Sequence, residues 1–133
     1  MDLQSPRETN NIISPQLLQH LYTLCYNFSA SLIGKKKTRE MLKSSHEQIL
    51  PYFQVLSAFK VTDKNELRIE LMTITDKELL GFTVWIQQFI KELRRFMVGL
   101  GKLTIESITT EIKDELEEVG FYEYYKKATE LEY

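Results

Sequence analysis

Residues 75–101 read TDKELLGFTVWIQQFIKELRRFMVGLG, and this segment decides the fold that we expect. Thr75 and Glu78 match the capping-box pattern, in which a threonine caps a helix and a glutamate reaches back to its backbone amide. Apolar residues then recur at steps of three and four: Leu79, Phe82, Trp85, Phe89, Leu93, Phe96 and Leu100. This spacing places them on one face of a helix. The segment therefore predicts a long amphipathic helix that ends at Gly101.

A pair of helices is predicted earlier in the chain. Ser14 and Pro15 match the cap and first position of a helix. Its apolar face is formed by Leu17, Leu21, Leu24, Phe28 and Leu32. Gly34 is typical of a helix end, and a second, thinner amphipathic pattern follows over 35–50. We therefore expect a helical hairpin whose two helices are joined at Gly34.

Between these helical segments the apolar pattern changes to a period of two. Phe59, Val61, Leu67, Ile69 and Leu71 alternate with polar residues on either side of the polar segment 62–66. The alternation predicts a β-hairpin over 59–72. Because an isolated hairpin is marginally stable in water, it must lie on the helices.

After Gly101 a fourth helix is predicted, with an apolar face of Ile105, Ile108, Ile112, Leu116 and Val119 and an end at Gly120. A short C-terminal helix follows. The fold class is therefore mainly α (α+β): two helical hairpins form a four-helix core, with a central β-hairpin and a short C-terminal helix.

The domain organisation is expected to be simple. Residues 1–13 lack periodicity and predict a flexible N-terminal arm, and 14–133 form a single helical domain. Its halves, 14–58 and 75–133, are joined by the β-hairpin 59–72. Gly34-Lys35 and Gly101-Lys102 each separate two amphipathic segments. This repetition is consistent with an internal duplication. Two unrelated helical hairpins would also match in part.

Composition favours a cytoplasmic domain of ordinary globular type. The chain has 133 residues, a net charge of −2 and one cysteine, Cys25, so an internal disulfide is excluded. Neither a signal peptide nor an apolar run of membrane-spanning length is visible. We therefore expect a cytoplasmic location and no membrane span.

The residues of common catalytic and cofactor sites are not clustered in the sequence. His20, His46 and Cys25 are not at metal-ligand spacing. Residues 29–36, SASLIGKK, lack the first glycine and the final serine or threonine of a phosphate-binding loop. We therefore expect no enzymatic activity, no metal and no cofactor.

Two segments are candidate binding surfaces. The first is basic and consists of Lys35, Lys36, Lys37, Arg39 and Lys43. Cations at a helix N-terminus favour an anion or an acidic partner, although solvated lysines are the simpler interpretation. The second is aromatic and consists of Phe121, Tyr122, Tyr124, Tyr125 and Tyr133. It predicts either a docking surface or packing on the helices.

These features favour a non-enzymatic protein-interaction or regulatory module, acting as a small cytosolic adaptor and expected to form a homodimer. One alternative is a nucleic-acid-binding regulator that uses the basic segment 35–43, although the net charge does not favour it. Another is a small-molecule sensor with an apolar pocket between the helices.

Overall fold

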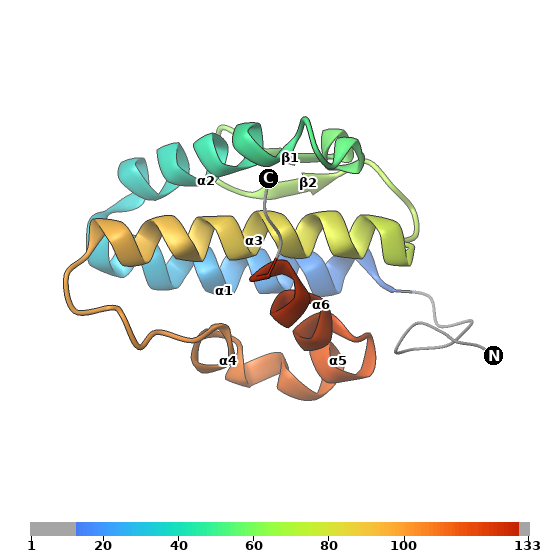
Figure 1. Ribbon diagram of the computed structural model, residues 1–133. Helices are drawn as coiled ribbons and strands as arrows, with labels where there is room; N and C mark the ends of the chain where they lie inside the picture. The colour runs from blue at the N-terminus through green and yellow to red at the C-terminus, as the bar shows by residue number, and fades with distance from the viewer. Residues whose placement is uncertain (1–12, 131–133) are drawn as a thin grey trace.

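The helix predicted from residues 75–101 lies at the centre of the fold (Figure 1). The computed structural model describes residues 13–130. This part of the chain is a mainly helical domain with a two-stranded antiparallel hairpin. Its elements are α1 (Pro15–Ile33), α2 (Lys35–Ile49), the 3₁₀ helix η1 (Gln54–Ala58), β1 (Phe59–Val61), β2 (Leu67–Ile69), α3 (Asp76–Phe96), α4 (Ile105–Ile108), the 3₁₀ helix η2 (Thr110–Ile112), α5 (Lys113–Glu118) and α6 (Phe121–Ala128).

The capping box at the start of α3 is confirmed. The backbone N–H of Thr75 donates to the Glu78 carboxylate at 2.7 Å. Every residue from 81 to 90 is buried, because α3 has neighbours on several sides. It contacts α2, η1 and α6, and α1 runs beside it in Figure 1. At Gly81 an added Cβ would lie 2.6 Å from Cγ2 of Val55, so glycine allows η1 to approach α3 closely.

The predicted end of this helix at Gly101 is wrong. The backbone of Met97 is already extended, and residues 97–104 form an irregular connection. The Arg94 guanidinium donates to the Leu103 carbonyl, which ties this connection back to α3. The helix therefore ends one turn earlier than its apolar spacing predicts.

The first helical hairpin is confirmed. The Ser14 side chain accepts a hydrogen bond from the backbone N–H of Gln16, and Pro15 is the first residue of α1. Gly34 joins α1 to α2 with a φ of 91°, a conformation that favours glycine. Ile13, which the sequence assigns to the flexible arm, is instead buried and pairs with Ile74. Residues 1–12 of the predicted arm lie outside the described residues.

The predicted β-hairpin is present, although its strands are shorter than the range 59–72. Phe59 pairs with Ile69 and Val61 with Leu67. The hairpin lies on α1, where the Gln19 side chain donates to the Leu67 carbonyl at 3.1 Å. These contacts bury one side of the hairpin, as its alternating pattern requires.

The predicted fourth helix is wrong, because the chain breaks into α4, η2 and α5. The break falls at Thr109, whose φ and ψ of −109° and 22° leave the helical region. Its hydroxyl bonds both the Ile105 carbonyl and the Tyr122 hydroxyl. The side chains of Ser107 and Thr110 also donate to nearby carbonyls. Such local bonds compete with regular helix.

These breaks alter the predicted four-helix core. Gly34 joins two long helices directly, whereas Gly101 lies in an irregular connection that is followed by short helices. The two halves therefore differ in structure, and a pair of equivalent helical hairpins is not observed. The short terminal helix α6 takes the place beside α3 that we expected of the fourth helix.

Candidate functional site

The basic segment is not gathered into one patch. The Lys37 ammonium lies 5.0 Å from the centre of the Phe96 ring and lines a groove between α2 and α3. Arg39 instead reaches the hairpin turn, where its guanidinium donates to the Asp63 carbonyl at 3.4 Å. Lys35 and Lys43 line two further depressions, beside Lys64 and Lys60 respectively. Successive residues of a helix point in different directions, and α2 therefore distributes its cations over several surfaces.

The aromatic segment is mostly buried within the domain. Phe121 is completely buried, and Tyr124 and Tyr125 are nearly so. Tyr122 is half-buried, and its hydroxyl lies 2.7 Å from the Thr109 hydroxyl. Burial raises the pKa of both Tyr122 and Tyr125. The segment therefore packs on its own domain, while Tyr133 lies outside the described residues.

Three of the five large apolar side chains that are exposed in the described part of the chain lie at one end of the molecule. The end of α1, the start of α2 and the end of α3 meet at the left of Figure 1. Leu32 there is 41% exposed, Phe96 is 50% exposed and Val98 is fully exposed. Lys36, Lys37 and Arg95 are exposed on the same segments. We call this set of six residues the basic–apolar end.

A groove of about 460 Å³ continues from the basic–apolar end between α2 and α3. Met41 and Phe96 supply apolar lining, and charged lining comes from both helices. The Glu92 carboxylate already accepts hydrogen bonds from the side chains of Gln48 and Gln88, at 2.6 and 3.0 Å. The groove therefore combines apolar side chains with the cations of Lys37 and Arg95 and the carboxylates of Glu40 and Glu92.

A second cavity, of about 320 Å³, lies between α1, the start of α2 and the hairpin turn. Tyr26 and Asn65 line it, and each has a buried side-chain oxygen without a hydrogen-bond partner among the described residues. A buried polar atom left unpaired costs about 1–3 kcal/mol. Sequence reasoning missed this pair, because 39 residues separate two positions that become neighbours only when the hairpin folds onto α1.

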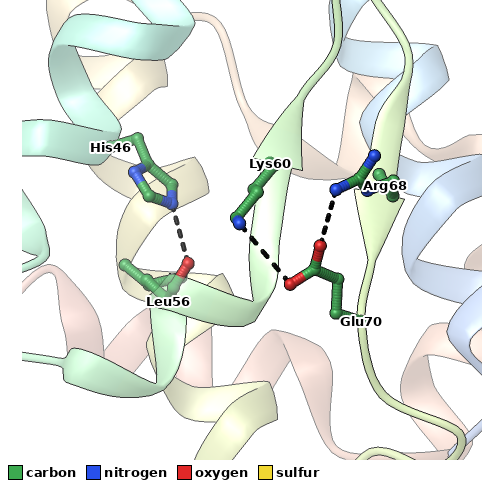
Figure 2. A network of polar contacts seen from close by, with 5 residues as sticks. All are labelled: His46, Leu56, Lys60, Arg68 and Glu70. Carbon is green, nitrogen blue, oxygen red and sulfur yellow. Dashed lines mark hydrogen bonds and ion pairs between the residues drawn. The ribbon is translucent and has the colours of Figure 1, made fainter.

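The polar groups shown in Figure 2 have structural roles. The His46 ring donates from Nε2 to the Leu56 carbonyl at 2.9 Å, which holds α2 to η1. Glu70 bridges the hairpin through Arg68 at 2.7 Å and Lys60 at 3.5 Å. The hydrogen bond from Arg68, followed by the charge of Lys60, lowers the pKa of Glu70.

Within residues 13–130, no cluster of three or more histidine, cysteine, aspartate or glutamate side chains is arranged to hold a metal ion. In the same part of the chain, no helix combines the length and the hydropathy needed to cross a membrane.

Cys25 is completely buried, and its burial raises the pKa of the thiol from 9.0 to about 12. Above about pH 9 the unfolded chain releases the thiol proton, whereas the folded protein keeps it. Release of this proton favours the unfolded state, so the stability of the folded protein is unaffected below about pH 9 and falls as the pH rises above it. We expect the free energy of unfolding to fall by up to about 1.4 kcal/mol per pH unit between about pH 9 and 10.

Urea denaturation of the native protein and of Cys25→Ala at several pH values measures this slope. The variant is less stable at every pH because it leaves a small cavity, but its stability should depend less steeply on pH in this window. Parallel curves for the two proteins would show that Cys25 does not carry the effect.

Comparison with protein-family models, with curated proteins and with solved structures finds no match for this chain.

Proposed function

We propose that this chain is a non-enzymatic protein-interaction module that binds an acidic, apolar segment of a partner protein at its basic–apolar end. The observation that carries the proposal is the full exposure of Val98 beside the half-exposed Phe96. Exposed apolar side chains that are rimmed by polar groups mark interaction surfaces. The adjoining groove supplies a concave surface for an apolar side chain of the partner.

Charge identifies the kind of partner. Lys36, Lys37 and Arg95 are exposed around these apolar residues, and Lys102 is exposed on the connection after α3. The six residues of the basic–apolar end include three cations and no acid, whereas the adjoining groove also contains Glu40 and Glu92. Electrostatic complementarity therefore favours a partner segment whose apolar residues are flanked by acids. A cytosolic adaptor role is the setting that we propose for such a module.

The test uses a synthetic amphipathic peptide with leucines on one face and glutamates beside them, and a second peptide with lysine in place of each glutamate. Fluorescence anisotropy should show the acidic peptide binding at least about tenfold more tightly, with an affinity that falls as salt is added. Val98→Asp should abolish the binding, because it places a charge against the apolar contact. Equal affinity for the two peptides, or no binding of either, would contradict the proposal.

Met72→Asp is the matched control. Met72 is 92% exposed and lies between β2 and α3, so the same type of substitution there should leave peptide binding unchanged. Loss of binding in both variants would point to a general effect of added negative charge and against the proposed surface.

The same end of the molecule offers a contact for a second copy of the chain, and the homodimer remains a proposal. Sedimentation velocity over a range of concentrations tests it directly. A dimer that dissociates in Val98→Asp but persists in Met72→Asp would place this end in the dimer contact. A monomer at every concentration would contradict the homodimer.

A further inference from the structure

The cavity at the hairpin turn is lined almost entirely by polar side chains, unlike the groove between α2 and α3. Tyr26 comes from α1, Lys35 is the first residue of α2, and Lys64, Asn65 and Glu66 come from the turn and β2 side of the hairpin. Its volume of about 320 Å³ is at the lower end of the range for small-molecule sites.

Unpaired buried atoms concentrate at this cavity. Tyr26 is 8% exposed, yet its hydroxyl has no hydrogen-bond partner among the described residues. The side-chain oxygen of Asn65 is also buried and also lacks a hydrogen-bond partner in this part of the chain. The described residues have one further atom of this kind, Nε of Arg94 in α3. Because buried polar atoms are paired in nearly all native structures, two unpaired atoms on residues that line one cavity require an explanation.

The backbone around Asn65 is well anchored, which makes rearrangement of the turn a poor explanation. Asn65 has a φ of 64°, and its backbone N–H donates to the Thr62 carbonyl at 2.9 Å. Its own carbonyl accepts a hydrogen bond from the Tyr22 hydroxyl at 3.2 Å. The main chain of Asn65 therefore has its partners, while its side-chain oxygen does not.

The charged groups of the cavity indicate what would supply the missing partners. The exposed ammonium groups of Lys35 and Lys64 attract an anion, and no side chain caps the N-terminus of α2 at Lys35. The positive end of a helix adds to the attraction for an anion. Glu66 is also exposed at the cavity and attracts a cation. The cavity therefore contains charged groups of both signs, with an excess of one positive charge.

We propose that this cavity binds a small amino dicarboxylate, an anion of the acidic amino-acid class. Its carboxylates accept hydrogen bonds from the Tyr26 hydroxyl and the two lysines. Its ammonium group donates to the Asn65 side-chain carbonyl and pairs with Glu66. A ligand of net charge −1 offsets the excess positive charge of the cavity. Both unpaired oxygens are buried, so the Tyr26 and Asn65 side chains turn toward the cavity when the ligand binds, while the backbone of the turn keeps its hydrogen bonds.

The first experiment is a titration of the whole chain with L-glutamate, followed by NMR of the backbone amides and by calorimetry. We expect saturable binding, with shifts concentrated at residues 23–27, 35 and 62–66. Glutarate, which lacks the ammonium group, and inorganic phosphate should each bind at least about tenfold more weakly. No saturation up to about 10 mM L-glutamate, or equal binding of glutarate or phosphate, would overturn the proposal.

Two variants separate binding from folding. Tyr26→Phe removes an unpaired hydroxyl, so we expect the free protein to be at least as stable as the native one while its affinity for L-glutamate falls about tenfold. Asn65→Gly keeps the positive φ of the turn and removes only the side-chain amide, so it too should fold and bind weakly.

Lys64→Ala should weaken binding, whereas Lys102→Ala, which removes the same charge outside the cavity, should not. Native affinity in both Tyr26→Phe and Asn65→Gly would overturn the proposed site. Equal losses in Lys64→Ala and Lys102→Ala would do so as well, since binding would then follow the net charge alone.

Discussion

Replacing Trp85 with alanine is expected to lower the free energy of unfolding by about 3–5 kcal/mol at 25 °C. Trp85 is completely buried in α3, and its ring contacts those of Tyr22 in α1 and His46 in α2, with centroids 6.2 and 5.0 Å apart. Its indole N–H donates to the Leu42 carbonyl at 3.1 Å. Truncating a buried tryptophan costs about 3–5 kcal/mol, against a total stability of about 5–15 kcal/mol for a domain.

Trp85→Phe is the control for this prediction. Phenylalanine keeps an aromatic ring among the three helices and removes the N–H. The Leu42 carbonyl retains a hydrogen bond from the Ser45 hydroxyl at 3.1 Å, so the lost bond should cost only about 1 kcal/mol. The chain has a single tryptophan, and urea denaturation is therefore followed by far-UV circular dichroism. Equal midpoints for the two variants would show that ring packing at Trp85 contributes little.

The parts of the fold that could be predicted are those in which local signals and packing agree. At α3 the capping box, the apolar spacing and the central position all favour the same helix. At Gly34 a break in the apolar pattern coincides with a residue that adopts a positive φ at low cost. Where local signals and packing agree in this way, the start of a helix can be predicted from the sequence alone.

The region after α3 shows why an apolar pattern can predict burial without predicting continuity. Ile105, Ile112 and Leu116 are all buried, as their spacing requires. The 3₁₀ turn at η2 preserves this spacing while the helix is interrupted at Thr109. At the interruption the Thr109 hydroxyl also contacts the hydroxyl of Tyr122, thirteen residues away, and this contact has no signature in the local pattern.

The candidate sites were harder to predict for a related reason. Lys35, Lys37 and Arg39 are neighbours in the sequence, but they line three different surfaces of α2. Conversely, Tyr26 and Asn65 are distant in the sequence and line one cavity. Clusters along a chain become clusters in space only where the geometry of the helix and the packing of its neighbours permit it.

Phe121→Ala is expected to destabilise the protein by about 3–5 kcal/mol, because it removes a completely buried ring. The ring lies 5.4 Å from that of Tyr122 and 5.9 Å from that of Tyr125, measured between centroids, so it holds α6 together as well as burying its face. α6 packs on α3, and Tyr125 lies near both Cys25 and Arg94. Loosening α6 should therefore uncover the Cys25 thiol.

Two measurements follow the change, urea denaturation and the rate at which a thiol reagent modifies Cys25 under native conditions. We expect a lower midpoint and a faster reaction in Phe121→Ala. Tyr122→Phe is the control, since it keeps the ring and removes only the bond to Thr109, at a cost of about 1 kcal/mol. A variant with native stability and a slow thiol reaction, but with altered self-association, would instead mean that the aromatic segment is a docking surface. The burial of Phe121, Tyr124 and Tyr125 favours the first result, because rings that already fill the domain core have little surface left for a partner.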